Sequence, residues 1–146
     1  MKIEAISAGV IDDLVRLACT LWPDCSAEEE AEYFKGMLAS DNATCFLVKE
    51  QEEYIAFIQL SLRTDYVEGT TTSPVAYVEG VYVQPEYRKS GIGRSLIARA
   101  EQWGKENGCK EFASDVLLEN QESIAFHKKV GLKEAGRIVC FVKALE

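Results

Sequence analysis

The residues from Val78 to Arg99 constrain this chain most, because they read as an apolar strand, a sharp turn and an amphipathic helix in direct succession. The first N–H groups of a helix have no intrahelical partner and attract anions. A glycine there lacks the Cβ atom that would keep a phosphate away from them. The pattern therefore predicts a phosphate-binding cradle at a strand-to-helix junction. Its two glycines and three cations are Gly91, Gly93, Arg88, Lys89 and Arg94.

Two familiar phosphate-binding loops do not match this turn. A Walker loop ends in Gly-Lys-Ser or Gly-Lys-Thr, whereas the Gly-Lys pair of this chain is part of the run Gly104-Lys105-Glu106. A dinucleotide-binding fingerprint needs a third glycine at the position of Leu96. What remains is the pattern Arg88-x-x-Gly91-x-Gly93 directly after an apolar strand. This pattern resembles the acetyl-CoA loop of the GCN5-related N-acetyltransferases.

Apolar spacing and turn residues predict the element order β-α-α-β-β-β-α-β-α-β. We expect strands at 2–6, 44–49, 54–62, 75–83, 111–115 and 137–143, and helices at 11–21, 26–38, 92–103 and 120–130. Such an order gives an α/β (α+β) fold, with a mixed twisted sheet of about six to seven strands flanked by about four helices. It is similar to the N-acetyltransferase fold from end to end. We expect one domain over residues 1–146.

Composition limits the partners. The chain carries 24 acidic and 16 basic side chains, a formal net charge of −8. A nucleic acid needs a basic face, so we expect no nucleic-acid partner, whereas an acidic surface attracts polycationic small molecules. No apolar run is long enough for a membrane span.

The five cysteines occur without a CxxC pair or a secretory leader, which favours reduced thiols in the cytoplasm. The single histidine, His127, has no partner at metal-ligand spacing, so we expect no metal.

The resemblance to the N-acetyltransferases implies acetyl-CoA as the acetyl donor. Its pyrophosphate would lie in the cradle, and its pantetheine arm would lie along the backbone of the preceding strand. Asn120 matches an asparagine that contacts this arm in the family, although asparagine is equally typical of a helix N-cap. The expected cofactor-binding residues are Val81, Tyr82, Val83, Arg88, Lys89, Ser90, Gly91, Ile92, Gly93, Arg94 and Asn120.

Two carboxylates interrupt the apolar central strands, Glu79 before the cradle and Asp115 at the end of the next strand. A primary amine has a pKa of about 10.4, so it must lose a proton before it attacks a thioester. Either carboxylate can take that proton or hold a cation, and a structural salt bridge is the alternative. His127 stands four residues before Gly131, where the family usually has a tyrosine. It is either the acid that protonates the departing thiolate or a packing residue.

Several further stretches match one family as a set. They are Leu21-Trp22-Pro23, Asp65-Tyr66-Val67-Glu68-Gly69, Ser73-Pro74-Val75, Val78-Glu79-Gly80, Gly108-Cys109-Lys110-Glu111, and Ala113-Ser114-Asp115 followed by Glu119-Asn120. Together they resemble the aminoglycoside 6′-N-acetyltransferases. The resemblance implies direct transfer of acetyl from acetyl-CoA, in a ternary complex, to the 6′-amine of kanamycin- and tobramycin-like antibiotics, conferring resistance. It also implies a homodimer in which the loop carrying Tyr66 helps to form the neighbour's drug site.

By position, this resemblance places Trp22, Tyr66, Glu79 and Asp115 against the drug. For Trp22, a core position is the alternative, because tryptophan is commonly buried. Some relatives carry a further acid after the last helix. Here Gly136 occupies that place and Glu134 stands two residues earlier, so Glu134 is the candidate for this contact.

Two other functions stay open. An acetyltransferase for polyamines, peptide N-termini or lysines would share the cradle and the acidic residues, but the segments around Trp22, Tyr66 and Asp115 favour the antibiotic family. A non-catalytic acyl-CoA-binding module is favoured by the missing tyrosine at position 127 and opposed by Glu79 and Asp115. Covalent catalysis by Cys109 or Cys140 lacks a neighbouring base in the sequence.

Overall fold

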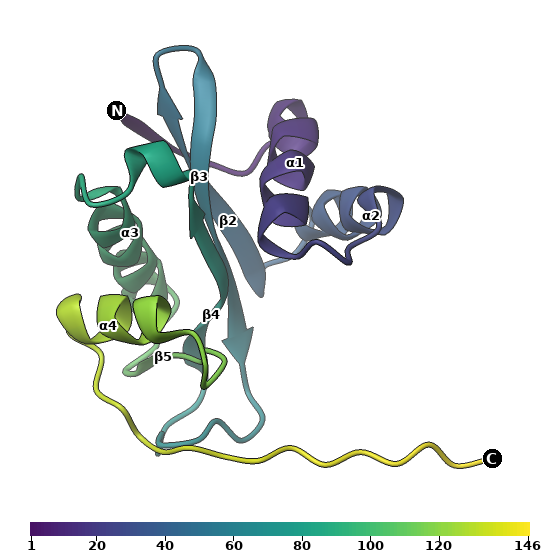
Figure 1. The fold of residues 1–146 in the computed structure, drawn as a ribbon, viewed down its shortest axis with the longest axis vertical. Coiled ribbons are helices and arrows are strands. Elements are labelled where there is room, and N and C mark those ends of the chain that lie inside the picture. The colour runs from purple at the N-terminus through teal and green to yellow at the C-terminus, as the bar shows by residue number, and fades with distance from the viewer.

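The computed structural model describes residues 1–146 and contains one twisted sheet with helices on both faces (Figure 1). The strands are β1 (Lys2–Ala5), β2 (Ala43–Glu50), β3 (Glu53–Arg63), β4 (Val75–Val83) and β5 (Phe112–Ser114), in sequence order across the sheet. The first four strands pair antiparallel, and β5 pairs parallel to β4. The expected mixed α/β fold is thus confirmed, with five strands in place of six or seven.

The helices are α1 (Ile11–Leu21), α2 (Ala27–Met37), α3 (Ile92–Glu106) and α4 (Gln121–Lys129), with 3₁₀ turns η1 (Ala8–Val10) and η2 (Pro85–Tyr87). In Figure 1, α1 and α2 cover one face of the sheet, and α3 and α4 lie on the other. Side chains of a strand alternate between the two faces. Accordingly Leu47 and Phe57 pack with α1 and α2, whereas Val48 and Ile58 pack with α3.

Two helix ends correct or refine the sequence predictions. Gly104 does not end α3, which continues to Glu106. A Cβ atom at Gly104 would lie 2.9 Å from the Cβ of Ala76, so the glycine lets α3 approach β4 closely. At the start of α4, the Asn120 side chain accepts a hydrogen bond from the Ser123 backbone N–H at 3.1 Å, as an N-cap does.

The segment after α4 differs most from expectation. The strand predicted at 137–143 forms no pair, and residues 132–146, here called the C-terminal arm, extend away from α4 (Figure 1). The arm has the apolar side chains of a strand but no neighbour to pair with. Its exposed apolar residues are Ile138, Val139, Phe141, Val142 and Leu145, of which Val142 is 99% exposed.

Cysteine pairing also differs from expectation. Cys19, near the end of α1, and Cys25, next to the N-cap of α2, form a disulfide with their Cα atoms 5.6 Å apart. The expectation of reduced thiols is therefore wrong for this pair, while Cys45, Cys109 and Cys140 are free. None of the helices has the length and apolar character that crossing a membrane requires.

Candidate active site

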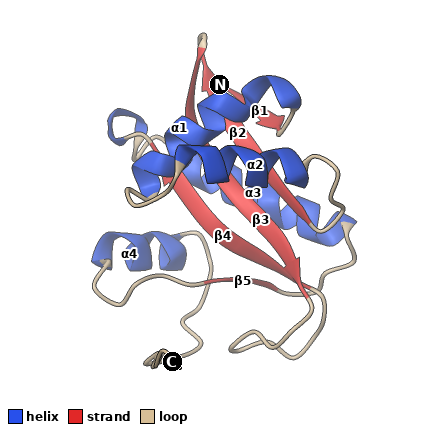
Figure 2. Ribbon diagram, turned by 90° about the vertical axis from the view of Figure 1, so that its right-hand side faces the viewer, coloured by secondary structure: helices blue, strands red, loops and turns tan.

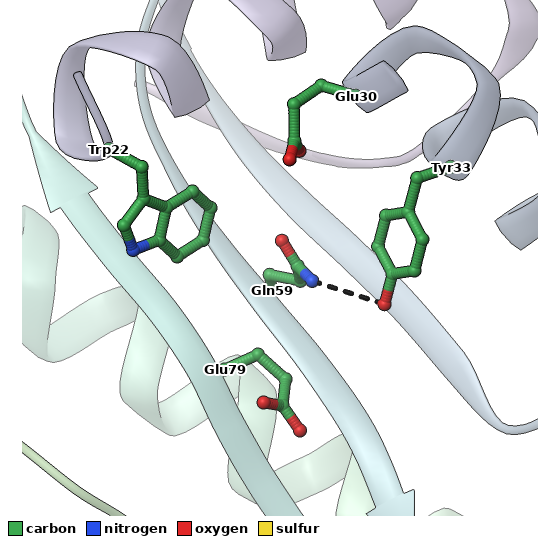
Figure 3. Close-up of a pocket in the computed structure, with 5 residues that line it drawn as sticks. All are labelled: Trp22, Glu30, Tyr33, Gln59 and Glu79. Carbon is green, nitrogen blue, oxygen red and sulfur yellow. Dashed lines mark hydrogen bonds between the residues drawn. The ribbon is translucent and has the colours of Figure 1, made fainter. Parts of the chain in front are cut away.

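Glu79 sits at a β-bulge in the centre of the sheet. In the pairing of β3 with β4, Gln59 lies opposite Gly80 and Leu60 lies opposite Val78, so Glu79 has no partner residue. An extra residue in one strand bends that strand locally and re-aims a side chain. The Glu79 side chain consequently lines a pocket between the sheet and the α1–α2 region (Figure 3).

This pocket has a volume of about 290 Å³ and draws its walls from four parts of the chain. Its lining residues are Trp22, Glu30, Tyr33, Gln59 and Glu79 (Figure 3). Two carboxylates and two aromatic rings in one open pocket suit a ligand that carries positive charge.

Trp22 forms one wall of the pocket, and its indole packs against the backbone of Gly80. A Cβ atom at Gly80 would lie 2.5 Å from the indole, so a side chain at position 80 would displace the ring. The indole also meets the Phe57 ring edge-on, with centroids 6.2 Å apart. Trp22 is thus fixed by packing on one side while it faces the pocket on the other.

Arg63 and Ser61 hold the Glu79 carboxylate. The Arg63 guanidinium donates two hydrogen bonds to it, from Nε at 3.0 Å and Nη2 at 2.8 Å, and the Ser61 hydroxyl donates a third. Burial alone would raise the pKa of Glu79, but these hydrogen bonds and the Arg63 charge outweigh burial and lower it. Glu79 is therefore ionised at neutral pH, which suits holding an ammonium group better than removing a proton.

The second predicted carboxylate, Asp115, is joined to Glu79 through two intermediate side chains. The Arg63 guanidinium lies 3.5 Å over the centre of the Tyr77 ring, and the Tyr77 hydroxyl donates a hydrogen bond to Asp115. Burial, then the bond to Asp115, raises the pKa of Tyr77, so this hydroxyl keeps its proton. The two carboxylates thus belong to one connected network, although Asp115 does not line the pocket.

The turn before α3 has the geometry of an anion cradle. Gly91 is the N-cap of α3 with φ of +88°, and no atom lies within 4 Å of where its Cβ would be. Arg88 Nε donates to the Val83 carbonyl at 2.8 Å, and Arg94 Nη2 donates to the Lys129 carbonyl at 3.1 Å. Both guanidinium groups are therefore anchored by backbone oxygens beside the start of α3.

The second glycine of the turn, Gly93, also has a packing role that the sequence did not indicate. A Cβ atom at Gly93 would lie 2.7 Å from the Phe126 ring on α4. The glycine therefore makes room for α4 to pack on α3.

Strands β4 and β5 diverge next to the cradle. They pair only where Ala76–Val78 faces Phe112–Ser114, so the side of β4 toward β5 has no partner strand from Glu79 to Val83. Figure 2 shows this divergence, with α4 beyond the opening. A strand edge with free N–H and C=O groups can bind an extended, amide-containing molecule. The backbone of Val81 and the N–H of Val83 are available for that purpose, while the Val83 carbonyl accepts from Arg88.

The family model for "Acetyltransferase (GNAT) family" matches residues 11–132. The chain belongs to the GNAT acetyltransferases. Among curated relatives of this acetyltransferase, the aminoglycoside N(6′)-acetyltransferase type 1 of Acinetobacter baumannii is 40% identical over 143 residues, which cover 98% of each chain. The protein of the same name from Acinetobacter haemolyticus is 38% identical over 146 residues, which cover 100% of each chain.

Two solved structures of AAC(6′) enzymes also match this chain over nearly its whole length. The structure of AAC(6′)-Iy with the bisubstrate analogue CoA-S-monomethyl-acetylneamine matches with a TM-score of 0.95 and 30% identity, covering 99% of this chain and 98% of that one. The structure of AAC(6′)-IG from Acinetobacter haemolyticus matches with a TM-score of 0.93 and 37% identity, covering 100% of both chains.

The predicted acceptor-site residues of this acetyltransferase divide into two groups. Trp22 and Glu79 line the pocket, and Asp115 reaches Glu79 through the Arg63–Tyr77 link. Tyr66 and Glu134 lie outside the pocket. The Tyr66 side chain is 79% exposed and donates to Glu68 at 2.7 Å, while Glu134 pairs with Arg137 at 2.9 Å.

His127 is held at both ring nitrogens. Its Nδ1 lies 2.7 Å from the Ser123 carbonyl oxygen, which only accepts, so Nδ1 carries the proton. In the neutral ring Nε2 then accepts from the Ser114 hydroxyl at 2.8 Å. In this neutral tautomer Nε2 carries no proton that a leaving thiolate could take.

Sequence reasoning missed several residues of the site. Glu30 was part of an acidic run typical of a solvated helix face, and Tyr33 carries no sequence signal of its own. Gln59 could have been found, because it interrupts the apolar strand from Tyr54 to Leu62. Arg63 lies one residue beyond the strand predicted at 54–62, but it is the last residue of β3. No group of His, Cys, Asp and Glu side chains is arranged to hold a metal ion.

Proposed function

We propose that this chain transfers the acetyl group of acetyl-CoA to the 6′-amino group of aminoglycoside antibiotics and thereby confers resistance. The observation that carries the proposal is that the acidic pocket and the free edge of β4 meet at Glu79. One site suits a polycationic amine and the other an amide-bearing arm, so both substrates would reach one strand. The relatives named aminoglycoside N(6′)-acetyltransferase support the same activity.

The cradle would hold the pyrophosphate of acetyl-CoA with Arg88, Lys89, Arg94 and the first amides of α3, and the backbone of Val81 and Val83 would hold the pantetheine amides. Acetyl-CoA supplies an activated thioester at this place. That the AAC(6′)-Iy structure carries a CoA-based bisubstrate analogue supports acetyl-CoA as the donor. We infer direct transfer within a ternary complex, because both substrates would then be oriented on one rigid sheet.

The chain's carboxylates would prepare the amine. Glu79, held ionised by Arg63, would bind the 6′-ammonium group, and a proton must leave before the nitrogen attacks the thioester carbonyl. Asp115, directly or through a water molecule, is the candidate acceptor of that proton. The nitrogen then bonds to the thioester carbon and the carbon–sulfur bond breaks. The nitrogen gives up its second proton as the amide forms, and the CoA thiolate takes up one proton to become the thiol. The tautomer of His127 makes it a poor source of this last proton unless the ring is first protonated.

We further propose a homodimer in which the two chains exchange their C-terminal arms. The arm exposes five large apolar side chains, and β5 is an edge strand without an outer neighbour. Edge strands readily accept a strand from another chain, and exchange of an identical element is a low-cost route to a dimer. The AAC(6′)-Iy structure covers 99% of this chain at a TM-score of 0.95, so the arm has a counterpart there.

Exchange of the arm would also bring the Tyr66 loop to the interface. A Cβ atom at Gly69 would clash with the Cβ of Ala135, so this loop contacts the base of the arm. Tyr66 would then face the partner's drug site, as the sequence suggested. The proposed enzyme acts as one domain over residues 1–146, in the cytoplasm.

A thiol-release assay tests this function. The purified chain with acetyl-CoA should release free CoA thiol when kanamycin or tobramycin is added, and the drug should gain the mass of one acetyl group. Spermine and a lysine-containing peptide, tested in parallel, represent the other acetyltransferase functions. The absence of thiol release with a panel of aminoglycosides would contradict the proposal. Faster release with spermine or the peptide would indicate that a polyamine or a lysine side chain is the acceptor instead.

A further inference from the structure

Three polar side chains share the pocket with Glu79 but have no part in the transfer described above. They are Glu30, Tyr33 and Gln59 (Figure 3). Glu30 and Tyr33 stand three positions apart on α2, so they project from the same face of the helix. Gln59 reaches up to them from β3, and the three surround the part of the pocket on the α2 side (Figure 3).

Gln59 has an unused hydrogen-bond acceptor. It is the polar side chain of the core, only 7% exposed. Its Nε2 donates to the Tyr33 hydroxyl at 3.4 Å, but its buried Oε1 has no hydrogen-bond partner. Buried polar atoms are nearly always paired, so this acceptor calls for a donor that comes from the pocket.

Glu30 likewise has no partner within the chain, as no ion pair or hydrogen bond engages its carboxylate. Burial, then the neighbouring charge of Glu29, raises its pKa. The ionised form of Glu30 would therefore be stabilised by a cation placed in the pocket. The rings of Trp22 and Tyr33 add aromatic surface, which also favours an ammonium group.

We propose that Glu30, Gln59 and Tyr33 form a second ammonium-binding subsite, which holds an amino group of the acceptor other than the one that is acetylated. The ligand class is a molecule with at least two ammonium groups, one at Glu79 and one between Glu30 and Gln59. A monoamine would leave the Gln59 acceptor and the Glu30 charge without a partner. This inference rests on the proposed function, and it adds residues that determine which acceptors bind.

The test compares a polyamine acceptor with a monoamine fragment of it. Kanamycin is the first acceptor, and 6-amino-6-deoxyglucose, which keeps only the reacting amine, is the second. The Glu30→Gln variant should raise the KM for kanamycin by about tenfold, the loss of one charged hydrogen bond. Its kcat should stay within about twofold, because the contact exists before and during the reaction. The rate with the fragment and the KM for acetyl-CoA should not change.

Glu28→Gln is the matched control. Glu28 is exposed on the same helix and does not line the pocket, so this variant removes the same charge without touching the subsite. Its KM for kanamycin should remain that of the unmodified protein. Equal changes in Glu28→Gln and Glu30→Gln would overturn the proposal, because the effect would then be one of net charge.

Gln59→Leu separates binding from a structural role. The variant removes a buried acceptor that nothing in the protein satisfies, together with one long hydrogen bond to Tyr33, a residue that is half exposed to water. Its melting temperature should therefore not fall, while its KM for kanamycin should rise by about threefold. A lower melting temperature with unchanged KM would contradict the subsite.

If the unmodified protein acetylates no aminoglycoside, the proposed function fails but the subsite is still tested. Calorimetric titration with kanamycin then gives the Kd of the unmodified protein and of Glu30→Gln. Weaker binding by the variant supports the subsite, and equal binding overturns it.

Discussion

The cradle and the pocket are built in contrasting ways. The cradle is one continuous run of seven positions, Arg88 to Arg94, and it consists of backbone amides and two arginines anchored on carbonyl oxygens. The pocket is made of side chains from α2, β3, β4 and the end of α1, and a charged network holds its central carboxylate. This difference implies that acceptor specificity can change by single substitutions while the cofactor site stays intact.

The largest effect is expected from neutralising Glu79, the pocket residue at which the free edge of β4 begins. Glu79→Gln removes the ammonium partner and leaves the Arg63 charge unpaired. We expect kcat/KM for kanamycin to fall by about a hundredfold, with the KM for acetyl-CoA unchanged. Initial rates with each substrate varied in turn measure both quantities. A raised KM for acetyl-CoA would show that Glu79 belongs to the cradle as well.

Asp115→Asn tests the candidate proton acceptor. The amide keeps the shape of the side chain and can still accept from Tyr77, but it cannot take a proton. We expect kcat to fall by about tenfold or more, with little change in either KM. Unchanged kinetics would remove Asp115 from the catalytic machinery.

Gly93→Ala tests whether the cradle depends on packing with α4. The added Cβ would meet the Phe126 ring at 2.7 Å, so we expect the free energy of unfolding to fall by about 1–3 kcal/mol. The KM for acetyl-CoA should rise by a few-fold as the start of α3 shifts. The double variant Gly93→Ala/Phe126→Leu should recover most of the stability. Stability equal to that of the unmodified protein in Gly93→Ala alone would contradict this role.

A smaller effect is expected on the pH dependence of kcat/KM for kanamycin, which reports the ionisation of Glu79 in the pocket. Folding lowers the pKa of Glu79. The ion pair with Arg63 therefore stabilises the fold at any pH above the pKa that Glu79 has in the unfolded chain. That stabilisation is lost as pH falls through the pKa that Glu79 has in the folded protein. In Arg63→Met only Ser61 opposes burial, so the pKa of Glu79 should rise. The acid limb of kcat/KM for kanamycin should therefore move to higher pH.

Arg63→Lys should give a shorter move of the acid limb, and Arg16→Met, which removes an exposed arginine on α1, should give none. If the acid limb stays in place in Arg63→Met, ionisation of Glu79 does not control acceptor binding.

The cradle is easier to predict from the sequence than the pocket, because its residues are consecutive and those of the pocket are not. The run of glycines and cations that makes up the cradle could be recognised because its residues are adjacent in the chain, whereas the packing of Gly93 against Phe126 could not. The pocket was predictable only at Trp22 and Glu79. Glu30, Tyr33 and Gln59 meet because a bulge at Glu79 and the placing of α2 bring distant positions together, and neither is encoded locally.

The fold shows the same division between local and distant determinants. Strand and helix periods gave nine of the ten expected elements, since each depends on local spacing. The strand expected at 137–143 has the composition of a strand, but a strand also needs a neighbour. In one chain that neighbour is missing, and the proposed exchange of C-terminal arms would supply it.

The position of the transferred acetyl group tests the central claim most directly. Kanamycin incubated with the protein and acetyl-CoA can be purified and its acetylated nitrogen assigned by NMR. The account predicts one acetyl group, on the 6′-nitrogen. An acetyl group on any other nitrogen, or a drug recovered unmodified, would contradict it.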